Sequence, residues 1–307
     1  MSKVVVTGGA GFIGSHLTDA LIKQGDQVIV IDNLSTGKKD NLNPKAEFFQ
    51  LDICDFEKIR PVFTDCDFVF HLAAIPRMPL SIERPRETSQ INIMGTISVF
   101  KAASEAKADR VVFASSSSVY GPQNTLPLKE EMIPNPISPY GLQKWVGERF
   151  AEMFGKHYDL SVVCLRYFNV YGPRVDFESD YSLVVGKFLR QHEQGEPLTI
   201  YGDGEQTRGF CYVGDVVRAT IKAAKAEGLR SGEIINIGLE KSHSVNYLAQ
   251  LIGGEKRYLP ERPGDPKHTQ ADMSKAKELL NWQPLVSFEQ GVERTWQWYK
   301  GTLNTER

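Results

Sequence analysis

A tyrosine and a lysine four residues apart are the side chains in this sequence best suited to acid–base chemistry. Tyr140 and Lys144 lie in the segment SPYGLQKWVGERF, where Ser138 and Pro139 predict the start of a helix. Residues spaced i, i+4 share one face of a helix, so the two side chains are neighbours. The ammonium of Lys144 favours the phenolate of Tyr140, which lowers the pKa of the phenol from about 10 toward that of a general base. The pair predicts a proton-transfer site at a helix start.

A serine-rich turn precedes this predicted helix. The segment RVVFASSSSVYG reads as a strand that ends in Ser115, Ser116 and Ser117. One of the three hydroxyls would lie near a substrate oxygen and hold it against Tyr140. A polar turn that merely ends a strand is the alternative interpretation. It explains the serines but not the Tyr-Lys pair that follows.

Three glycines spaced three apart predict a dinucleotide site near the start of the chain. Gly8, Gly11 and Gly14, in TGGAGFIGSHL, follow a predicted strand and open a predicted helix. Glycines permit a tight turn and close backbone approach, while the helix N–H groups receive a pyrophosphate. The second strand ends in Asp32, about where an acid meets the adenosine ribose hydroxyls. A carboxylate there repels the 2′-phosphate of NADP, so we expect NAD, whose positive nicotinamide would also favour the phenolate of Tyr140.

Two features near Asp32 leave alternatives open. Lys38 and Lys39 follow it closely, and either could reach a phosphate and so admit NADP. Asp52 ends the third predicted strand, where an adenine contact is expected, but an acid there is equally suited to cap a helix.

The elements that must position these residues alternate between short strands and longer helices. Strand-like runs cover residues 3–8, 27–32, 46–52, 67–73, 110–116 and 161–167, with amphipathic stretches between them. Such alternation predicts an α/β fold, namely a Rossmann-type doubly wound parallel sheet with a smaller C-terminal α/β lobe. We expect residues 1–168 to form the NAD-binding domain, with a return segment at about 205–226. Residues 169–204 and 227–307 would then form the nucleotide-sugar-binding lobe.

Composition narrows the function classes. The 307 residues carry 36 Lys+Arg against 38 Asp+Glu, a net charge of −2, which gives no basic field for nucleic acid. The four cysteines lack CxxC spacing, and the six histidines show no ligand spacing, so we expect reduced thiols and no metal. No apolar run approaches the roughly 18 residues of a membrane span, and we expect a cytoplasmic protein without membrane contact.

Several motifs occur together in the order typical of one family. TGGAGFIG, HLAA, SSSVYG, YGLQK, LRYFNVYGP, IYGDGEQTR and RPGD resemble the extended short-chain dehydrogenase/reductase family over nearly the whole chain. The match is most similar to the UDP-hexose 4-epimerases of the UDP-glucose and UDP-N-acetylglucosamine type. The resemblance implies NAD-dependent C4 epimerisation of a UDP-hexose through a 4-keto intermediate. It also implies a homodimer that pairs through helices near residues 90–106 and 140–156.

The resemblance further implies a set of site residues. Ser116 matches the catalytic hydroxyl beside Tyr140 and Lys144, with Ser115 or Ser117 in its place if the turn is slipped by one. The cofactor-binding positions, besides Tyr140 and Lys144, are Gly8, Gly11, Phe12, Ile13, Gly14, Asp32, Asn33, Asp52, Ile53, Leu72, Ala73 and Ala74. The substrate-binding positions, besides Ser116 and Tyr140, are Arg77, Asn169, Arg208, Arg262 and Thr269.

Departures from the family pattern separate this chain from some relatives. Sugar-nucleotide 4,6-dehydratases carry an Asp-Glu pair after the catalytic hydroxyl, where this chain has Ser117 and Ser118. Decarboxylating relatives place a Glu in that turn, which is also absent here. Gly209 and Gly214 stand where relatives commonly have Asp.

The residue at position 269 bears on the choice of hexose. Relatives restricted to plain hexoses tend to have a Tyr where this chain has Thr269, so we expect a pocket that admits 2-acetamido sugars. One alternative is a UDP-uronic acid 4-epimerase, with Arg77 facing the sugar carboxylate. Arg77 could instead touch the sugar or a phosphate, or simply face solvent. A non-catalytic NAD-binding protein of the same fold is the other alternative.

Overall fold

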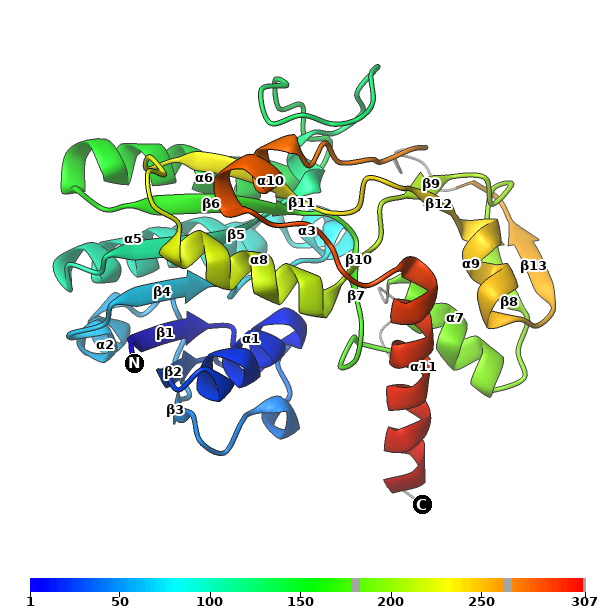
Figure 1. Cartoon of the computed structure of the whole chain (residues 1–307), viewed down its shortest axis with the longest axis horizontal. Helices are drawn as coiled ribbons and strands as arrows, with labels where there is room; N and C mark the ends of the chain where they lie inside the picture. Colours follow the sequence, from blue (N-terminus) through cyan, green and yellow to red (C-terminus); the bar gives the residue numbers. More distant parts are fainter. Residues whose placement is uncertain (178–182, 262–266, 306–307) are drawn as a thin grey trace.

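A seven-stranded parallel sheet forms the centre of the structure, a computed structural model that describes residues 1–177, 183–261 and 267–305 (Figure 1). Its strand order is β3-β2-β1-β4-β5-β6-β11, and every neighbouring pair is parallel. The order reverses direction between β1 and β4, which places the switch point of a doubly wound sheet beside the glycine-rich turn. The strands are β1 (Lys3–Thr7), β2 (Gln27–Ile31), β3 (Glu47–Phe49), β4 (Phe68–His71), β5 (Arg110–Ser116), β6 (Val162–Tyr167) and β11 (Glu233–Ile237).

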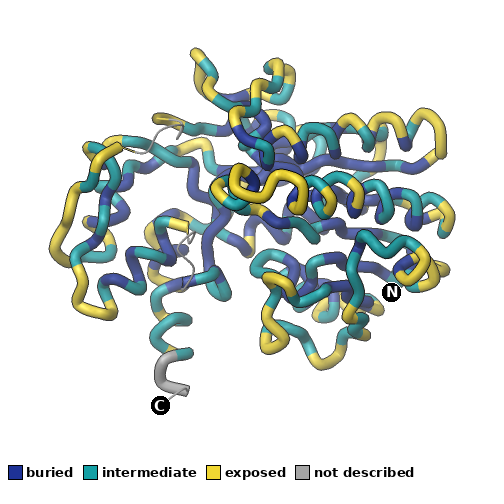
Figure 2. Tube along the Cα trace, turned by 180° about the vertical axis from the view of Figure 1, so that it is seen from behind, coloured by how far each residue is buried: buried dark blue, intermediate teal, exposed yellow. Residues whose placement is uncertain are grey.

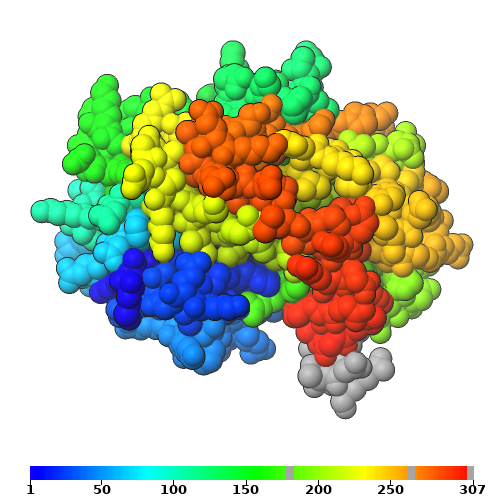
Figure 3. All heavy atoms as spheres, in the orientation of Figure 1, coloured from blue at the N-terminus to red at the C-terminus, as the bar shows by residue number. Residues whose placement is uncertain are grey.

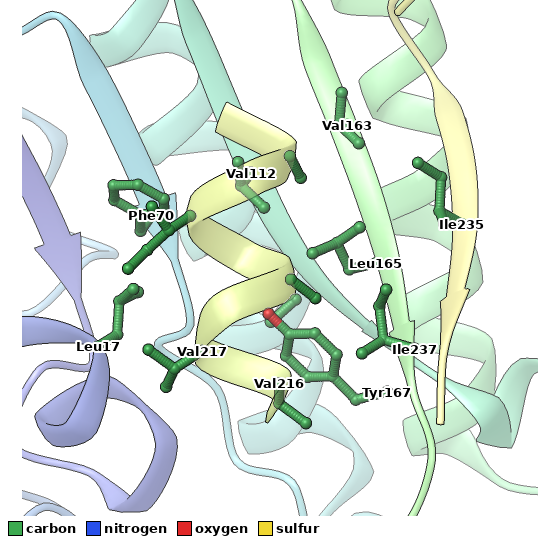
Figure 4. Packing of buried hydrophobic residues seen from close by; sticks show 14 of the residues in the cluster. Leu17, Phe70, Val112, Val163, Leu165, Tyr167, Val216, Val217, Ile235 and Ile237 are labelled. Atoms are coloured by element: carbon green, nitrogen blue, oxygen red, sulfur yellow. The ribbon is translucent and has the colours of Figure 1, made fainter. Parts of the chain in front are cut away.

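Helices cover both faces of this sheet, which explains the near-continuous apolar runs in its strands. On one face, α1 (Phe12–Lys23) and α8 (Val213–Lys225) bury Leu17, Val216 and Val217 against side chains of the strands (Figure 4). On the other face, α2 (Phe56–Ile59), α5 (Thr96–Glu105) and α6 (Pro139–Tyr158) form a second core. Figure 2 shows the strands as buried positions, with exposed positions on the outer sides of the helices.

The remaining helices are short or belong to the second half of the chain. They are α3 (Met78–Glu83), α4 (Pro85–Ser89), α7 (Val184–Glu193), α9 (Val245–Ile252), α10 (Ser274–Leu280), α11 (Phe288–Thr305), the 3-10 turns η1 (Lys39–Asn41), η2 (Arg60–Phe63) and η4 (Ser117–Val119), and the π-helical η3 (Gln90–Gly95). None of the helices within the described residues is long and apolar enough to cross a membrane.

A smaller lobe stands beside the carboxyl ends of the strands, on the right in Figure 1. Its core gathers side chains of α7, α9 and α11, and the described residues of the lobe also form three two-stranded sheets. These sheets pair β10 (Cys211–Tyr212) with β7 (Val170–Tyr171), β12 (His243–Ser244) with β9 (Thr207–Arg208), and β13 (Lys256–Leu259) with β8 (Leu198–Tyr201). Phe177 stacks on Trp298 and Tyr299 of α11, so the aromatic residues near the C-terminus pack within the lobe.

The return of the chain to the large sheet extends further than the sequence indicated. We expected it to end near residue 226, but β11 follows and pairs with β6 over Glu233–Ile237. β11 had no distinct sequence signal, because its apolar run EIINI is short. α10 then packs against α8 and β11, and Figure 3 shows this C-terminal segment lying over the surface of α8.

Candidate active site

The glycine-rich turn is a close backbone cradle between β1 and α1. Gly8 has φ +77°, and a Cβ placed there would lie 2.6 Å from the backbone nitrogen of Ala73 in the segment after β4. A Cβ at Gly14 would lie 2.1 Å from the carbonyl oxygen of Gly8. Helix α1 begins after Gly11, and no side chain caps it in the part of the chain that the structure describes. The turn therefore fits a dinucleotide phosphate, which needs backbone N–H groups and a surface free of side chains.

Asp32 follows β2 and lies beside this cradle. Its carboxylate accepts hydrogen bonds from the backbone N–H groups of Ala10, at 3.0 Å, and Leu34, at 2.8 Å. Burial raises the pKa of the Asp32 carboxyl, against the lowering by these two hydrogen bonds. The acid is thus fixed at the place where an adenosine ribose would meet it. Lys38 is held nearby through its backbone N–H, which donates to the carbonyl of Ala10.

Asp52 does not cap a helix. Its Oδ1 accepts from the backbone N–H of Cys54 at 2.8 Å, and its Oδ2 accepts from Asn33 Nδ2 at 3.1 Å. The N-cap position of α2 is Asp55 instead. The structure therefore removes the capping interpretation of Asp52 and brings together Asn33, Asp52 and the neighbouring Ile53, three of the predicted cofactor contacts.

The serines at the end of β5 point in different directions. Ser115 is buried and donates to Glu148 Oε1 of α6 at 2.7 Å. Ser116 caps η4 by accepting from the backbone N–H of Ser118 at 3.1 Å, and it is hydrogen-bonded to Tyr140. Side chains alternate along a strand, so only one of these two neighbours can face Tyr140. The geometry favours Ser116 over Ser115.

Tyr140 and Lys144 occupy the first turns of α6. Ser138 caps the helix by accepting from the backbone N–H of Gly141 at 3.1 Å, and Pro139 follows at the first helical position, as the sequence predicted. The Lys144 ammonium lies 6.0 Å from the centre of the Tyr140 ring and donates to the carbonyl of Ala114 at 2.7 Å. Both side chains are at least nine-tenths buried.

In the protein without NAD, the pKa of Tyr140 lies above its ordinary value, and its lowering by Lys144 and the nicotinamide together stays a prediction. Burial raises the pKa of the Tyr140 phenol to about 12, although the hydrogen bond with Ser116 opposes this rise. Burial likewise lowers the pKa of Lys144 to about 7, against the opposing field of Glu148. Desolvation is the largest contribution to both pKa shifts. A further positive charge beside the phenol is needed to make it a base near neutral pH.

His71 is a buried strand residue in this structure. Its Nδ1 and Nε2 are hydrogen-bonded to the hydroxyls of Thr7 and Thr96, at 2.7 and 3.0 Å. Burial lowers the pKa of His71 to about 3, with a smaller contribution from Lys144, so the ring is neutral. These contacts support its interpretation as a structural residue.

Three polar side chains that sequence reasoning missed tie the site together. Asn92 of η3 is buried, and it exchanges hydrogen bonds with the backbone of Ile75 and donates to Gln143 Oε1 at 2.7 Å. Ser81 of α3 accepts from the backbone N–H of Tyr140 at 3.1 Å. The available signal was the polar Asn92 within the apolar run QINIMGTISVF, and no pattern marked Ser81 or Gln143.

The predicted substrate residues of the lobe meet around Thr269. Asn169 Nδ2 donates to Thr269 Oγ1 at 3.3 Å. Arg208 on β9 lies next to Gly209, whose backbone N–H donates to the carbonyl of Thr269 at 3.0 Å. The structure thus brings together Asn169, Arg208 and Thr269. Arg262 falls outside the described residues.

Arg77 makes an ion pair that the sequence did not suggest. It precedes α3, and its Nη2 lies 2.7 Å from Asp176 Oδ2 in the segment after β7. The two side chains are about a quarter and a third exposed. Arg77 therefore does not simply face solvent, because a carboxylate already pairs with it.

The two glycines that depart from the family pattern sit in tight surroundings. A Cβ at Gly209 would lie 2.9 Å from the carbonyl oxygen of Leu239, and one at Gly214 would lie 3.1 Å from the Tyr212 ring. The local backbone leaves little room for an aspartate at position 209.

Comparison with known proteins was consistent across sequence and structure. The model of the NAD dependent epimerase/dehydratase family matches residues 4–238. A putative UDP-glucose 4-epimerase of Methanocaldococcus jannaschii is 41% identical over 98% of this chain and all of its own length. The crystal structure of a UDP-glucose 4-epimerase with UDP-glucose from Thermotoga maritima has a TM-score of 0.94 and 39% identity, covering 98% of this chain and 99% of its own. A UDP-N-acetylglucosamine 4-epimerase of Methanobrevibacter ruminantium, in complex with UDP-N-acetylmuramic acid, has a TM-score of 0.93 and 39% identity, with coverages of 98% and 99%.

Proposed function

This chain belongs to the NAD dependent epimerase/dehydratase family, and on that premise we propose that it inverts the C4 hydroxyl of a UDP-hexose through a transient 4-keto sugar. The observation that carries the proposal is the meeting of Ser116, Tyr140 and Lys144 at the carboxyl ends of the strands, beside the glycine cradle. The UDP-sugar 4-epimerases among its relatives and structural neighbours support this reaction.

NAD bound in the cradle would supply a hydride acceptor and donor for C4 and a positive ring that favours the phenolate of Tyr140. The N–H groups at the start of α1 and the Asp32 carboxylate would hold the dinucleotide. Because epimerisation involves no net redox change, the protein would have no need to release this cofactor.

The proton moves through Tyr140. Its phenolate takes the proton of the C4 hydroxyl, and its phenol returns it after the sugar has turned. Ser116 holds the same oxygen by a hydrogen bond, and Lys144 stabilises the phenolate. Asn92, through Gln143, and Ser81 keep α6 in place and act as positioning residues.

The smaller lobe would bind the nucleotide while the sugar rotates. Arg208 and Arg262 would hold the diphosphate or ribose, with Asn169 at a phosphate. Thr269 would line the sugar pocket, where its small side chain leaves room for a 2-acetamido group. UDP-N-acetylglucosamine, UDP-N-acetylgalactosamine and the two plain UDP-hexoses are therefore the proposed substrates.

A UDP-uronic acid is the second candidate substrate, and Arg77 is the residue on which it depends. The ion pair with Asp176 speaks against this candidate, because a carboxylate already neutralises the guanidinium at 2.7 Å. A sugar carboxylate would have to displace Asp176. Asp176→Asn should therefore raise activity on UDP-uronic acids relative to UDP-hexoses if Arg77 faces the sugar.

We also propose the larger organisation of the protein. The NAD-binding domain would comprise residues 1–168 and a return segment that extends through β11, and the lobe would comprise most of the rest. Three large apolar side chains, Met94 of η3 and Leu142 and Met153 of α6, are exposed, which supports a homodimer through these helices. The four cysteines are free, which accords with the cytoplasmic location that we propose.

The test is conversion of a panel of UDP-hexoses and UDP-uronic acids by the purified protein, with the products separated and identified. We expect interconversion of C4 epimers without added NAD. Tyr140→Phe should abolish conversion while the protein keeps its NAD, because the ring still packs but no phenolate forms. Near wild-type turnover by that variant would show that Tyr140 is not the base, and no conversion by the wild type would rule out the proposed reaction.

A further inference from the structure

A buried ion pair lies one helical turn beyond Lys144. Arg166 donates from Nε to Glu148 Oε1 and from Nη2 to Glu148 Oε2, each at 2.8 Å, and both side chains are almost fully buried. Two parallel N–H···O bonds of this kind fix both distance and orientation. Removing two charges from water is costly, and a buried pair seldom adds stability over apolar side chains of the same volume. Its position therefore calls for a second explanation.

The pair connects the two elements that carry the proposed catalytic residues. Glu148 follows Lys144 by four residues on α6, and Arg166 lies on β6 directly opposite Ser115 of β5. Ser115 donates to the same Glu148 oxygen at 2.7 Å. The strand end that presents Ser116 and the helix that presents Tyr140 are thus bound to one carboxylate.

The network continues to the last strand of the sheet. The Arg166 guanidinium lies 4.5 Å from the centre of the Tyr120 ring, and the Tyr120 hydroxyl donates to Asn236 Oδ1 of β11 at 2.7 Å. Although burial alone would lower it, the pKa of Arg166 is raised by its contacts with Glu148 and Tyr120. The guanidinium therefore stays charged throughout the physiological range.

The groups around Lys144 determine how strongly the Glu148–Arg166 pair affects its electrostatic potential. Lys144 is faced by His71 from β4, by Cys164 from β6, and by Tyr140 and Glu148 on its own helix. Burial lowers the pKa of His71 to about 3 and raises that of Cys164, so both are neutral near pH 7. The carboxylate of Glu148 and the guanidinium bound to it are then the charges that set the potential at the site.

We infer that Glu148 and Arg166 form a positioning unit that fixes α6 on the sheet and sets the electrostatic potential in which Tyr140 transfers its proton and Lys144 stabilises the phenolate. The inference rests on the proposed function for the roles of Tyr140 and Lys144. Glu148 and Arg166 act through these residues and do not touch the substrate.

Opposite shifts in pH dependence distinguish this role from a purely structural one. Glu148→Gln removes a negative charge, so neighbouring groups lose protons more readily and both limbs of the kcat profile move to lower pH. Arg166→Met removes a positive charge and moves both limbs to higher pH. A shift of about one unit is expected for each. The double variant should return the profile close to that of the wild type, with a reduced kcat.

Two further variants separate charge from geometry. Arg166→Lys keeps the positive charge but loses the two parallel hydrogen bonds to Glu148. We therefore expect a lower kcat and an unchanged pH profile. Arg149→Gln is the matched control, because Arg149 pairs with Glu152 on the exposed side of α6 at 2.8 Å. That surface pair should leave kcat and the profile unchanged.

Separate measurements show whether each variant is folded and whether its proton transfer has changed. Thermal unfolding and the NAD content of each variant show whether it is folded, and Ser115→Ala, which removes no charge, should lower kcat a few-fold with KM and NAD content unchanged. Ultraviolet difference titration against the corresponding Tyr140→Phe protein gives the ionisation of Tyr140 even if no UDP-hexose is converted. Equal profiles in folded Glu148→Gln and Arg166→Met, or wild-type kcat in Ser115→Ala, would overturn the inference.

Discussion

At the scale of single residues, the end of β5 shows how one position separates a reacting hydroxyl from a supporting one. Ser115 turns to Glu148 and Ser116 to Tyr140, so adjacent serines on one strand have different partners on the same helix, α6. The sequence alone did not decide which of the three serines carries the catalytic hydroxyl, because a run of identical residues does not fix the register of a strand. The register comes from the pairing of β5 with β6.

Ser116→Ala should lower kcat by about 10² to 10³, the range for the loss of one preorganised hydroxyl. KM and NAD content should change little, because the hydroxyl acts when charge develops on the C4 oxygen. Steady-state kinetics on the best UDP-hexose of the panel measures this. Ser117→Ala is the control, and a larger loss in that variant than in Ser116→Ala would move the assignment by one residue.

Thr269→Tyr should reduce kcat/KM on UDP-N-acetylhexosamines by at least about tenfold relative to UDP-glucose. A tyrosine would fill the space that an acetamido group needs and would break the hydrogen bond from Asn169. Thr269→Ser retains that hydroxyl and should keep the wild-type ratio. The measurement is kcat/KM of each variant on both sugar types. An equal loss of kcat/KM on both would show that Thr269 does not line the sugar pocket.

At the scale of elements, the start of α1 depends on a glycine that tolerates no side chain. Gly14→Ala places a methyl group 2.1 Å from the carbonyl of Gly8, so the turn must open. We expect loss of bound NAD and a lower melting temperature, measured by nucleotide release on denaturation and by calorimetry. Gly301→Ala in α11 meets no atom within 4 Å and should keep the NAD and gain about 0.5–1 kcal/mol of stability. Full NAD content in Gly14→Ala would contradict the cradle.

The sequence predicted the elements that carry their own local signals. The six strand runs of the first half, the cap of α6 at Ser138 and the glycine cradle were all readable, because hydrophobic runs, caps and glycine spacing are local properties. β11 and the Glu148–Arg166 pair were not, because each is defined by a partner far along the chain. The ion pair of Arg77 with Asp176 belongs to the same class, since no spacing joins the two residues.

At the scale of the whole molecule, the exposed apolar side chains of η3 and α6 predict how two copies associate. Met153→Lys should convert the proposed dimer to a monomer, because a charge would be buried at the centre of the paired helices. Light scattering after size exclusion should then give the mass of one chain. Ile133→Lys alters an apolar residue that is 83% exposed on a loop and should leave the dimer intact. A dimer that survives Met153→Lys would place the contact elsewhere.

The late position of β11 has a consequence for the chain as it leaves the ribosome. β6 is buried along its whole length, yet its outer neighbour is made only after the roughly 65 residues between Tyr167 and Glu233. At about 5–20 residues per second, this interval lasts roughly 3–13 s. During that time the nascent chain presents an open, apolar strand edge, which is a template for wrong pairing. A ribosome that stalls between these two strands therefore holds the molecule in an aggregation-prone state that the finished fold conceals.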